Sequence, residues 1–470
     1  MTVKTRFAPS PTGYMHLGNA RTALFNALFA WQEQGVFLLR IEDTDQERST
    51  TEFAQQLMQD LQWLGLSWQE GPNVNEISPP YYQAQRGEIY ARYYQQLMDN
   101  DQAYPCFCSA AELSLSRKLQ RAAGQAPRYA GTCAHLSPSE IEAKLAQGVQ
   151  PTLRFRVPKN EKIIFTDMVR GEQQFMSDDI GDFIIRRADG TPAFFFCNAI
   201  DDALMQVTKA LRGEDHLTNT PRQLMILSAL NLPAPQYGHF SLILGHDGAP
   251  LSKRNGSMSI KELREKGWLS LAVVNYLARL GHSYTEDTLL SLEELARQIN
   301  DQRLGHAPSR FDPQHLKHWQ QLALSQLDDE QWWQWLTHNI TLEIPSDLCH
   351  LFIHAVRPNV LFPEDAQQWA EMILTENLVW NEEAHLVIKE TDSAFFNHAL
   401  IALHNSQGDY AKLVDELKQT SGLKGKKLFM PLRAALTGVT HGPEMAYLLP
   451  LIGIHRAEQR LSSAADQDSL

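Results

Sequence analysis

The sequence predicts an α/β protein that carries an α+β insertion and ends in an all-α domain. Three observations support this fold class. A strand, helix and strand pattern opens the chain, and helical spacing dominates its last third. Short strand-like segments separated by Gly and Asp turns fill its middle: TLRFRVP, KIIFTD and DFIIRR. At 470 residues the chain is long enough for two to four domains.

The first strand, helix and strand unit spans residues 5–43. TRFAP predicts a short strand, residues 12–18 a loop rich in turn residues, and residues 20–34 an amphipathic helix. The run VFLLRIED is apolar and ends in acids, which is typical of a buried parallel strand. Such a unit implies a parallel sheet whose ligand crevice lies at the carboxyl ends of its strands.

Composition limits the class of protein. The chain is 43% hydrophobic and 21% charged, it has no apolar run near the ~18 residues that a membrane span requires, and its first residues lack the apolar core of a secretory signal. We therefore expect a cytoplasmic protein, and five cysteines suit a reducing compartment better than a disulfide framework. The net charge of -13 argues against indiscriminate binding to nucleic acid or membranes, but it leaves room for a local basic surface.

His16 and Gly18 lie where a loop enters the first predicted helix. A helix N-terminus offers unpaired N–H groups and the positive end of a dipole, so it favours phosphate. Gly18 would let a ligand approach the backbone, and His16 could donate to a phosphate oxygen. The bare His-x-Gly pattern occurs again at His246 and Gly248, so only its place behind a strand favours this role over a histidine that caps its own loop.

A second segment, APLSKRNGSMS at residues 249–259, places Lys253 and Arg254 among proline, glycine and serines. Such a loop fits a mobile clamp that closes on negative charge. A solvated basic loop has the same composition and is the alternative.

These two segments resemble the signature motifs of class I aminoacyl-tRNA synthetases, "HIGH" and "KMSKS", which here read HLGN and PLSKR. Five segments, in the same order, are similar to bacterial glutamyl-tRNA synthetases: RFAPSPTGYMHLGNARTAL, LLRIEDTDQERS, LRGEDHLTNTPRQ, SKRNG and KGKKLFMPLRAALTG. The resemblance covers essentially the whole chain. It implies a Rossmann-type catalytic domain in two halves around an acceptor-binding insertion, then a stem-contact region with the clamp loop and an all-helical anticodon-binding domain. The expected boundaries are 1–103 and 198–245 for the two catalytic halves and 104–197 for the insertion. The stem-contact region is expected at 246–320 and the anticodon-binding domain at 321–470.

The resemblance implies an enzyme that joins L-glutamate to ATP as glutamyl-adenylate, releases pyrophosphate, and transfers the glutamyl group to the terminal adenosine of tRNA. Neither step needs a protein nucleophile, so the protein must position the reactants and stabilise charge on phosphate oxygens. His16, Gly18 and Lys253 would do so with the Mg²⁺ that ATP carries. Asn19 and Arg254 would complete the ATP site.

Glutamate recognition needs cations for its carboxylates, and Arg6 and Arg212 stand where the family has its glutamate-binding arginines. Ser10, Glu42 and Asn198 match further substrate-contacting positions of some members. Glu42 would face the α-ammonium group of glutamate. By pattern alone, Glu42 is an ordinary acid at the end of a strand.

Two positions depart from the family pattern. Phe194 stands where relatives usually have tyrosine, so a hydroxyl and its charge-assisted hydrogen bond to glutamate, worth ~1.5–3 kcal/mol, are missing. Pro250 replaces the first lysine of the clamp motif. Lys253 retains the second lysine, so we expect the clamp to work.

Cys106, Cys108, Cys133 and His135 form a C-x-C…C-x-H arrangement of two close pairs. Structural Zn²⁺ favours such a set, because each pair can come from one turn and the metal then joins the two turns. In relatives Tyr129 competes as the fourth ligand. The alternative is a loop of reduced cysteines that has lost its metal.

An acidic protein that binds tRNA must concentrate its cations. KELREK at residues 261–266 does so, as do residues near the C-terminus: Lys418, Lys424, Lys426, Lys427 and Arg433. The unstacked bases of an anticodon loop are a suitable target for the helical domain, although a charge cluster is more often a solvated face. Arg357 lies where bacterial relatives inspect the anticodon, so we expect Arg357→Gln to change tRNA preference.

Three other functions compete with this interpretation. Glutaminyl-tRNA synthetases use C-terminal β-barrels, whose strand and turn pattern the last third lacks, and glutamyl-queuosine enzymes lack the helical domain expected here. A catalytically silent tRNA-binding paralogue is conceivable because of Phe194 and Pro250. Bacterial members of the family charge tRNA-Glu, tRNA-Gln or both, are usually monomers, and do not bind membranes.

Overall fold

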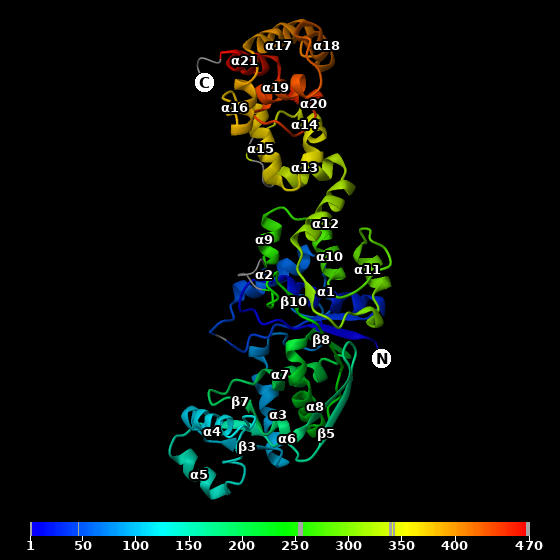
Figure 1. Cartoon of the computed structure of the whole chain (residues 1–470). Helices are drawn as coiled ribbons and strands as arrows, with labels where there is room; N and C mark the ends of the chain where they lie inside the picture. The colour runs from blue at the N-terminus through cyan, green and yellow to red at the C-terminus, as the bar shows by residue number, and fades with distance from the viewer. Residues whose placement is uncertain (1, 46, 252–256, 338–340, 342–343, 467–470) are drawn as a thin grey trace. The chain divides into compact units, whose positions relative to one another are not determined.

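The computed structural model describes residues 2–45, 47–251, 257–337, 341 and 344–466 (Figure 1). The chain divides into two compact units: Met1–Leu263 with Ser270–Trp319, and Arg264–Leu269 with Gln320–Leu470. Within the described ranges, no helix combines the length and the apolar character needed to cross a membrane.

The first unit is built on a four-stranded sheet in the order β2-β1-β8-β9, in which all neighbours run parallel. The strands are β1 (Lys4–Phe7), β2 (Val36–Leu39), β8 (Lys209–Gly213) and β9 (Gln236–Phe240). Helix α1 (Leu17–Gln32) connects β1 to β2, so the predicted strand, helix and strand unit is confirmed. The helix begins three residues before the predicted start, because Leu17 and Ala20 are buried and their packing outweighs the low helix propensity of Gly18.

The chain between β2 and β8 forms two smaller antiparallel sheets, β3-β4-β7 and the hairpin β5-β6. Their strands are β3 (Ala103–Cys106), β4 (Thr152–Phe155), β5 (Lys162–Asp167), β6 (Gly171–Met176) and β7 (Phe183–Arg186). Figure 1 shows β3 beside helices α4 (Ala110–Ala122) and α5 (Pro138–Ala146) at one end of this unit. Each of the two helices begins with a capping box, in which a serine and a glutamate satisfy the first backbone N–H groups.

Helices cover the sheets of the first unit and continue the chain beyond β9. They are α2 (Thr51–Trp63), α3 (Gly87–Asp99), α6 (Ser177–Ile180), α7 (Phe194–Leu204), α8 (Thr220–Ala229), α10 (Ser270–Arg279) and α11 (Leu292–Gln298). A short parallel pair, β10 (Ile243–Leu244) and β11 (Ser309–Arg310), lies among them. Helices α9 (Ile260–Glu265) and α12 (Pro313–Gln326) each begin in the first unit and end in the second.

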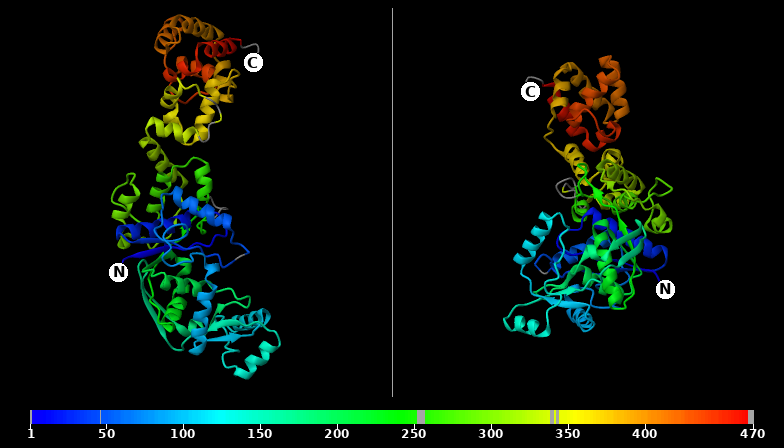
Figure 2. Two further views of the ribbon diagram at one scale, coloured as in Figure 1. Left: turned by 180° about the vertical axis from the view of Figure 1, so that it is seen from behind. Right: turned by 60° about the horizontal axis from the view of Figure 1, so that its bottom comes forward.

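The second unit consists of helices within its described residues, as the two views of Figure 2 show for its yellow-to-red part. They are α13 (Asp329–Thr337), α14 (Cys349–Val356), α15 (Pro363–Leu374), α16 (Glu382–Lys389), α17 (Ser393–Ser406), α18 (Tyr410–Ser421), α19 (Lys426–Thr437), α20 (Met445–Ile452) and α21 (Ile454–Ala465). Their apolar faces share one core, which includes the fully buried Trp332. The predicted fold class, an α/β domain with an α+β insertion followed by an all-α domain, is confirmed.

Candidate active site

A cleft of about 410 Å³ lies at the carboxyl ends of β1, β2 and β8. This is the place that the parallel sheet predicts for a ligand. The predicted substrate residues that line the cleft are Arg6, Ser10, Gly18, Asn19, Glu42, Phe194, Asn198 and Arg212. They come from four separate segments of the sequence.

The start of α1 forms one wall of the cleft. His16 is the N-cap of this helix and has an extended backbone, and Gly18 lies in the first turn. Among the described residues outside its own helix, no heavy atom lies within 4 Å of a Cβ built on Gly18, so the glycine leaves room for a ligand. The first turn contains no acidic residue, so the positive end of the helix dipole is available to a phosphate.

The segment after the basic loop is anchored to the same wall. The N–H of Ile260 donates to the carbonyl of Met15 at 2.8 Å, and Ser259 forms an antiparallel bridge with His16. The structure therefore places the segment that follows the basic loop beside the start of α1, although Ser259 and His16 lie 243 positions apart in the sequence. The two predicted cations of the loop lie outside the described residues: Lys253 and Arg254.

Four buried charges form a network under the cleft. Arg6 Nε donates to both carboxylate oxygens of Asp202 at 3.2 Å. Arg40 donates to Asp202 Oδ1 at 2.8 Å and to Glu42 Oε1 at 3.0 Å. Because buried charges are tolerated only when they are paired, this network fixes Arg6 and Glu42 in place.

Glu42 and Asn198 meet at the same end of the cleft. Asn198 Nδ2 donates to Glu42 Oε1 at 2.5 Å, and Asn198 Oδ1 accepts from Gln223 Nε2 at 2.9 Å. Burial raises the pKa of Glu42 above its ordinary value, although Arg40 opposes the shift. A ligand ammonium group beside Glu42 would favour its ionised form.

Arg212 is a buried cation that is fixed on two sides. Its Nε donates to His239 Nε2 at 3.1 Å, and its Nη2 donates to Thr220 Oγ1 at 2.9 Å and to Gln223 Oε1 at 2.6 Å. Its buried Nη1 has no hydrogen-bond partner among the described residues. Burial lowers the pKa of Arg212 to about 10, so the guanidinium is charged at neutral pH. The arrangement leaves one donor for an anionic ligand.

Phe194 and His216 stack on the edge of the cleft, with ring centroids 5.1 Å apart and planes at 29°. Burial lowers the pKa of His216 to about 4, although the neighbouring Asp215 carboxylate opposes the shift. The imidazole is therefore neutral at pH 7. Phe194 offers a ring where a tyrosine would offer a hydroxyl.

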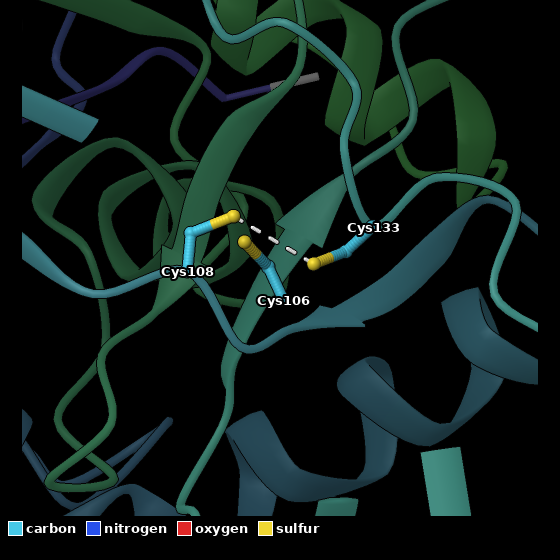
Figure 3. A group of neighbouring side chains, drawn as sticks. All are labelled: Cys106, Cys108 and Cys133. Atoms are coloured by element: carbon cyan, nitrogen blue, oxygen red, sulfur yellow. Dashed lines mark hydrogen bonds between the residues drawn. The ribbon is translucent and has the colours of Figure 1, made fainter. Parts of the chain in front are cut away.

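The cysteine cluster lies in the insertion, where the side chains of Cys106, Cys108 and Cys133 point toward one another (Figure 3). The Sγ atoms of Cys106, Cys108 and Cys133 lie within 4.8 Å of one another, and those of Cys108 and Cys133 are 3.7 Å apart. The Tyr129 hydroxyl lies 3.3 Å from Cys106 Sγ and 3.5 Å from Cys108 Sγ. His135 is exposed and is not part of this group.

The donor set of the cluster suits zinc. Although burial opposes it, hydrogen bonds from Tyr129 and Arg154 lower the pKa of the Cys106 thiol to about 7. A metal binds the thiolate, so a lowered thiol pKa favours binding. Three thiols and one phenol oxygen from two turns would leave no position for water, which is typical of a structural site.

Arg357, the predicted anticodon residue, is half-buried in the second unit. Its Nη1 donates to Asp329 Oδ1 at 3.2 Å, and its Nη2 donates to the carbonyls of Leu324 and Leu327. These bonds join the end of α12, the start of α13 and the turn after α14. Arg357 therefore also has a structural role.

Sequence reasoning missed the residues that hold the substrate residues in place. Asp202 and Arg40 fix Arg6, whereas Thr220 and His239 fix Arg212. The one available signal for these supporting residues was the segment LRGEDHLTNTPRQ, which contains His216 and Thr220. Arg40 lies in the segment LLRIEDTDQERS, but no role was assigned to it, and Asp202 and His239 belong to no motif that the sequence analysis singled out.

Comparison with known proteins identifies the family of the chain. Residues 2–318 match the family "tRNA synthetases class I (E and Q), catalytic domain", and residues 314–465 match the "Anticodon binding domain" family. The chain is 57% identical over 465 residues to glutamate–tRNA ligase 2 of Nitrosococcus oceani, covering 99% of this chain and 98% of the relative. It is 54% identical over 462 residues to glutamate–tRNA ligase 2 of Coxiella burnetii, covering 98% and 99%. A crystal structure of a glutamate tRNA ligase from Elizabethkingia meningosepticum, in complex with its amino acid, matches with a TM-score of 0.89 at 27% identity and covers 99% of both chains.

Proposed function

Because the chain belongs to the glutamate–tRNA ligases of the class I tRNA synthetase family, we propose that it charges tRNA-Glu, tRNA-Gln or both with L-glutamate through a glutamyl-adenylate. The observation that carries the choice of amino acid is Arg212, a buried cation that lines the cleft and whose Nη1 has no hydrogen-bond partner among the described residues. Arg212 would bind one carboxylate of glutamate, and Glu42 would bind its α-ammonium group.

In the first step, an oxygen of the α-carboxylate of glutamate attacks the α-phosphorus of ATP. The new O–P bond forms as the bond between the α-phosphorus and the bridging oxygen breaks, and the electron pair leaves with pyrophosphate. The start of α1, with His16 and Gly18, would stabilise the charge on the phosphate oxygens, and Asn19 lies in the same turn. Lys253 and Arg254 would act from the basic loop, and Mg²⁺ accompanies ATP as its counter-ion.

In the second step, a ribose hydroxyl of the terminal adenosine attacks the carbonyl carbon of the adenylate. The ester bond forms, AMP leaves with the electron pair of the broken C–O bond, and the proton of the hydroxyl passes to a phosphate oxygen or to water. The protein's contribution is again to position the reactants. We do not propose a catalytically silent tRNA-binding protein, because the similar relatives are named as glutamate–tRNA ligases.

We further propose that the cysteine cluster binds one structural Zn²⁺ through Cys106, Cys108, Cys133 and Tyr129 rather than His135. The support is the convergence of three thiols with the Tyr129 hydroxyl and the exposure of His135. The ion would join the turn after β3 to the turn that contains Tyr129 and Cys133. The proposal also includes action as a monomer in the cytoplasm, which size-exclusion chromatography and cell fractionation would test.

The decisive experiment is glutamylation of purified tRNA-Glu and tRNA-Gln transcripts side by side, with ATP, Mg²⁺ and radiolabelled glutamate. Charging of either tRNA supports the proposed function, and the ratio of the two rates defines the tRNA partner. Arg357→Gln, tested in the same assay, should change that ratio if Arg357 reads the anticodon. Tight tRNA binding with no charging and no glutamate-dependent exchange of pyrophosphate into ATP would contradict the proposal.

A further inference from the structure

The β5-β6 hairpin of the insertion packs closely against strand β9 of the central sheet. The N–H of Met168, in the hairpin turn, donates to the carbonyl of Tyr237 at 2.8 Å. A Cβ built on Gly238 would lie 3.2 Å from Met168 Cβ and 2.5 Å from Leu211 Cδ2, so only glycine allows this close approach. The hairpin turn is therefore fixed to the strand next to β8, which contains Arg212.

Asp167, the last residue of β5, occupies the centre of this contact. Its Oδ1 accepts hydrogen bonds from the backbone N–H groups of Val169 and Arg170 at 2.9 Å and of His239 at 3.1 Å. Its Oδ2 lies 2.5 Å from His239 Nδ1. Both side chains are fully buried. Such a fully satisfied buried pair holds one geometry.

Three side chains contact the ring nitrogens of His239 and select one tautomer: Asp167 at Nδ1, and Arg212 and Thr220 at Nε2, where the Thr220 hydroxyl lies 3.2 Å away and can donate. The Asp167 carboxylate only accepts, so Nδ1 carries the proton, and the Arg212 guanidinium only donates, so Nε2 must be unprotonated. Burial lowers the pKa of His239, although Asp167 opposes the shift, and the ring is therefore neutral. Asp167, His239 and Arg212 form a chain of hydrogen bonds from the insertion to the cleft.

We propose that Asp167 and His239 are positioning residues for amino-acid recognition: Asp167 fixes the tautomer of His239, and His239 Nε2 then orients the guanidinium of Arg212 toward the substrate carboxylate. This inference rests on the proposed function, in which Arg212 binds glutamate. It makes the hairpin of the insertion a part of the amino-acid site, even though no residue of the hairpin lines the cleft.

The test is Asp167→Asn, which keeps an acceptor for the backbone N–H groups but presents an amide N–H to His239 Nδ1. The ring must then carry its proton on Nε2, where it opposes the Arg212 donor. We expect KM for glutamate to rise about 10- to 100-fold in ATP–pyrophosphate exchange with tRNA present, while KM for ATP and the Kd for tRNA stay within about twofold. The matched control is Glu172→Gln, the same chemical change at an exposed position of the hairpin.

A second pair of variants separates this role from simple support of the fold. His239→Gln keeps an acceptor near Arg212 Nε, whereas His239→Leu removes it, so KM for glutamate should be at least about fivefold lower in the Gln variant. In the His239→Gln background, Asp167→Asn should change KM for glutamate by less than about twofold, because its effect passes through the histidine. If Asp167→Asn fails to fold, the comparison of His239→Gln with His239→Leu still tests whether an acceptor at position 239 orients Arg212.

The outcomes separate this inference from the proposed function. If the unmodified protein shows no glutamate-dependent exchange, the proposed function fails and this inference fails with it. If the unmodified protein is active but Asp167→Asn leaves KM for glutamate unchanged, the inference alone is overturned. Equal KM values for His239→Gln and His239→Leu, or equal rises in KM for glutamate and for ATP, would also overturn it.

Discussion

The cleft and the cysteine cluster each gather polar side chains inside the first unit, but different interactions hold these side chains in place. In the cleft, Asp202 forms ion pairs with Arg6 and Arg40, and Arg212 donates hydrogen bonds to neutral acceptors such as His239. In the cluster, three thiols meet within 4.8 Å of one another. The difference teaches that the chain's own ion pairs and hydrogen bonds hold the proposed amino-acid site, whereas the cluster gathers three thiols of the kind that zinc binds.

The largest effect should come from Arg212→Gln, which removes the buried cation proposed to face the substrate carboxylate. We expect kcat/KM for glutamate to fall roughly 10²- to 10³-fold, because truncating one partner of a buried charge pair costs about 3–4 kcal/mol. ATP–pyrophosphate exchange with tRNA present measures it. Arg222→Gln on α8 is the control, since Arg222 does not line the cleft. A fall of less than about tenfold for Arg212→Gln would mean that another residue binds the carboxylate.

The substitution Cys133→Ser tests whether the cysteine cluster binds zinc. If the cluster depends on a metal, the variant should lose about one zinc per chain and its Tm should fall by about 5 °C or more, because bound structural zinc contributes to folding. Elemental analysis and calorimetry measure the two quantities. Cys349→Ser, in the second unit, is the control and should change neither. Full zinc content in Cys133→Ser would disprove the proposed ligand set.

The substitution Phe194→Tyr should strengthen glutamate binding by adding a hydroxyl donor to the cleft. The tyrosine can keep the stacking on His216 and supply the hydroxyl that Phe194 lacks. KM for glutamate should fall about tenfold or more, the worth of one charge-assisted hydrogen bond of ~1.5–3 kcal/mol. Phe195→Tyr is the matched control, because its neighbour Phe194 lines the cleft and Phe195 does not. An unchanged KM for Phe194→Tyr would show that no substrate oxygen comes within reach of the new hydroxyl.

The smallest effect near neutral pH should come from the titration of Glu42. Its carboxylate must be ionised to bind the substrate ammonium, and burial raises its pKa, so its protonation begins at a higher pH than for an ordinary glutamate. As pH falls through this raised pKa, KM for glutamate should rise, by about tenfold per pH unit once Glu42 is mostly protonated. The charged groups that face Glu42 are Arg40, Arg6 and Asp202.

A pH profile of KM between pH 8 and pH 5 measures this effect. His216 does not contribute in this range, because its pKa is about 4. Glu42→Gln should bind glutamate weakly at every pH and should lack the acid dependence. The same acid dependence in Glu42→Gln would assign the titration to another group.

Much of the fold could be predicted because local patterns agree with the tertiary structure. The apolar run after residue 35 predicted β2, and the segments TLRFRVP, KIIFTD and DFIIRR correspond to β4, β5 and β7. The start of α1 was placed too late, because glycine and asparagine at positions 18 and 19 suggested a loop and burial of Leu17 could not be read from the sequence. Local propensity is overridden where packing stabilises a terminal turn.

The candidate site was predicted in part. Motifs located Arg6, Glu42 and Arg212, whose types suit a carboxylate and an ammonium group, and the cleft brings all three together. The motif LLRIEDTDQERS contains Arg40 but did not predict that Arg40 joins Glu42 to Asp202, because Asp202 is distant in the sequence and no local pattern encodes that contact.

The sequence by itself determined the parallel sheet, the position of the cleft at its carboxyl ends, the helical second unit and the chemical types of the substrate residues. These properties follow from hydrophobic period and from residue chemistry, which are local. Only the tertiary structure decided that Tyr129 rather than His135 contacts the thiols, and that Asp167 of the insertion reaches Arg212 through His239 of β9. Hydrogen bonds between residues 72 positions apart depend on how strands and hairpins pack, and no local pattern encodes that geometry.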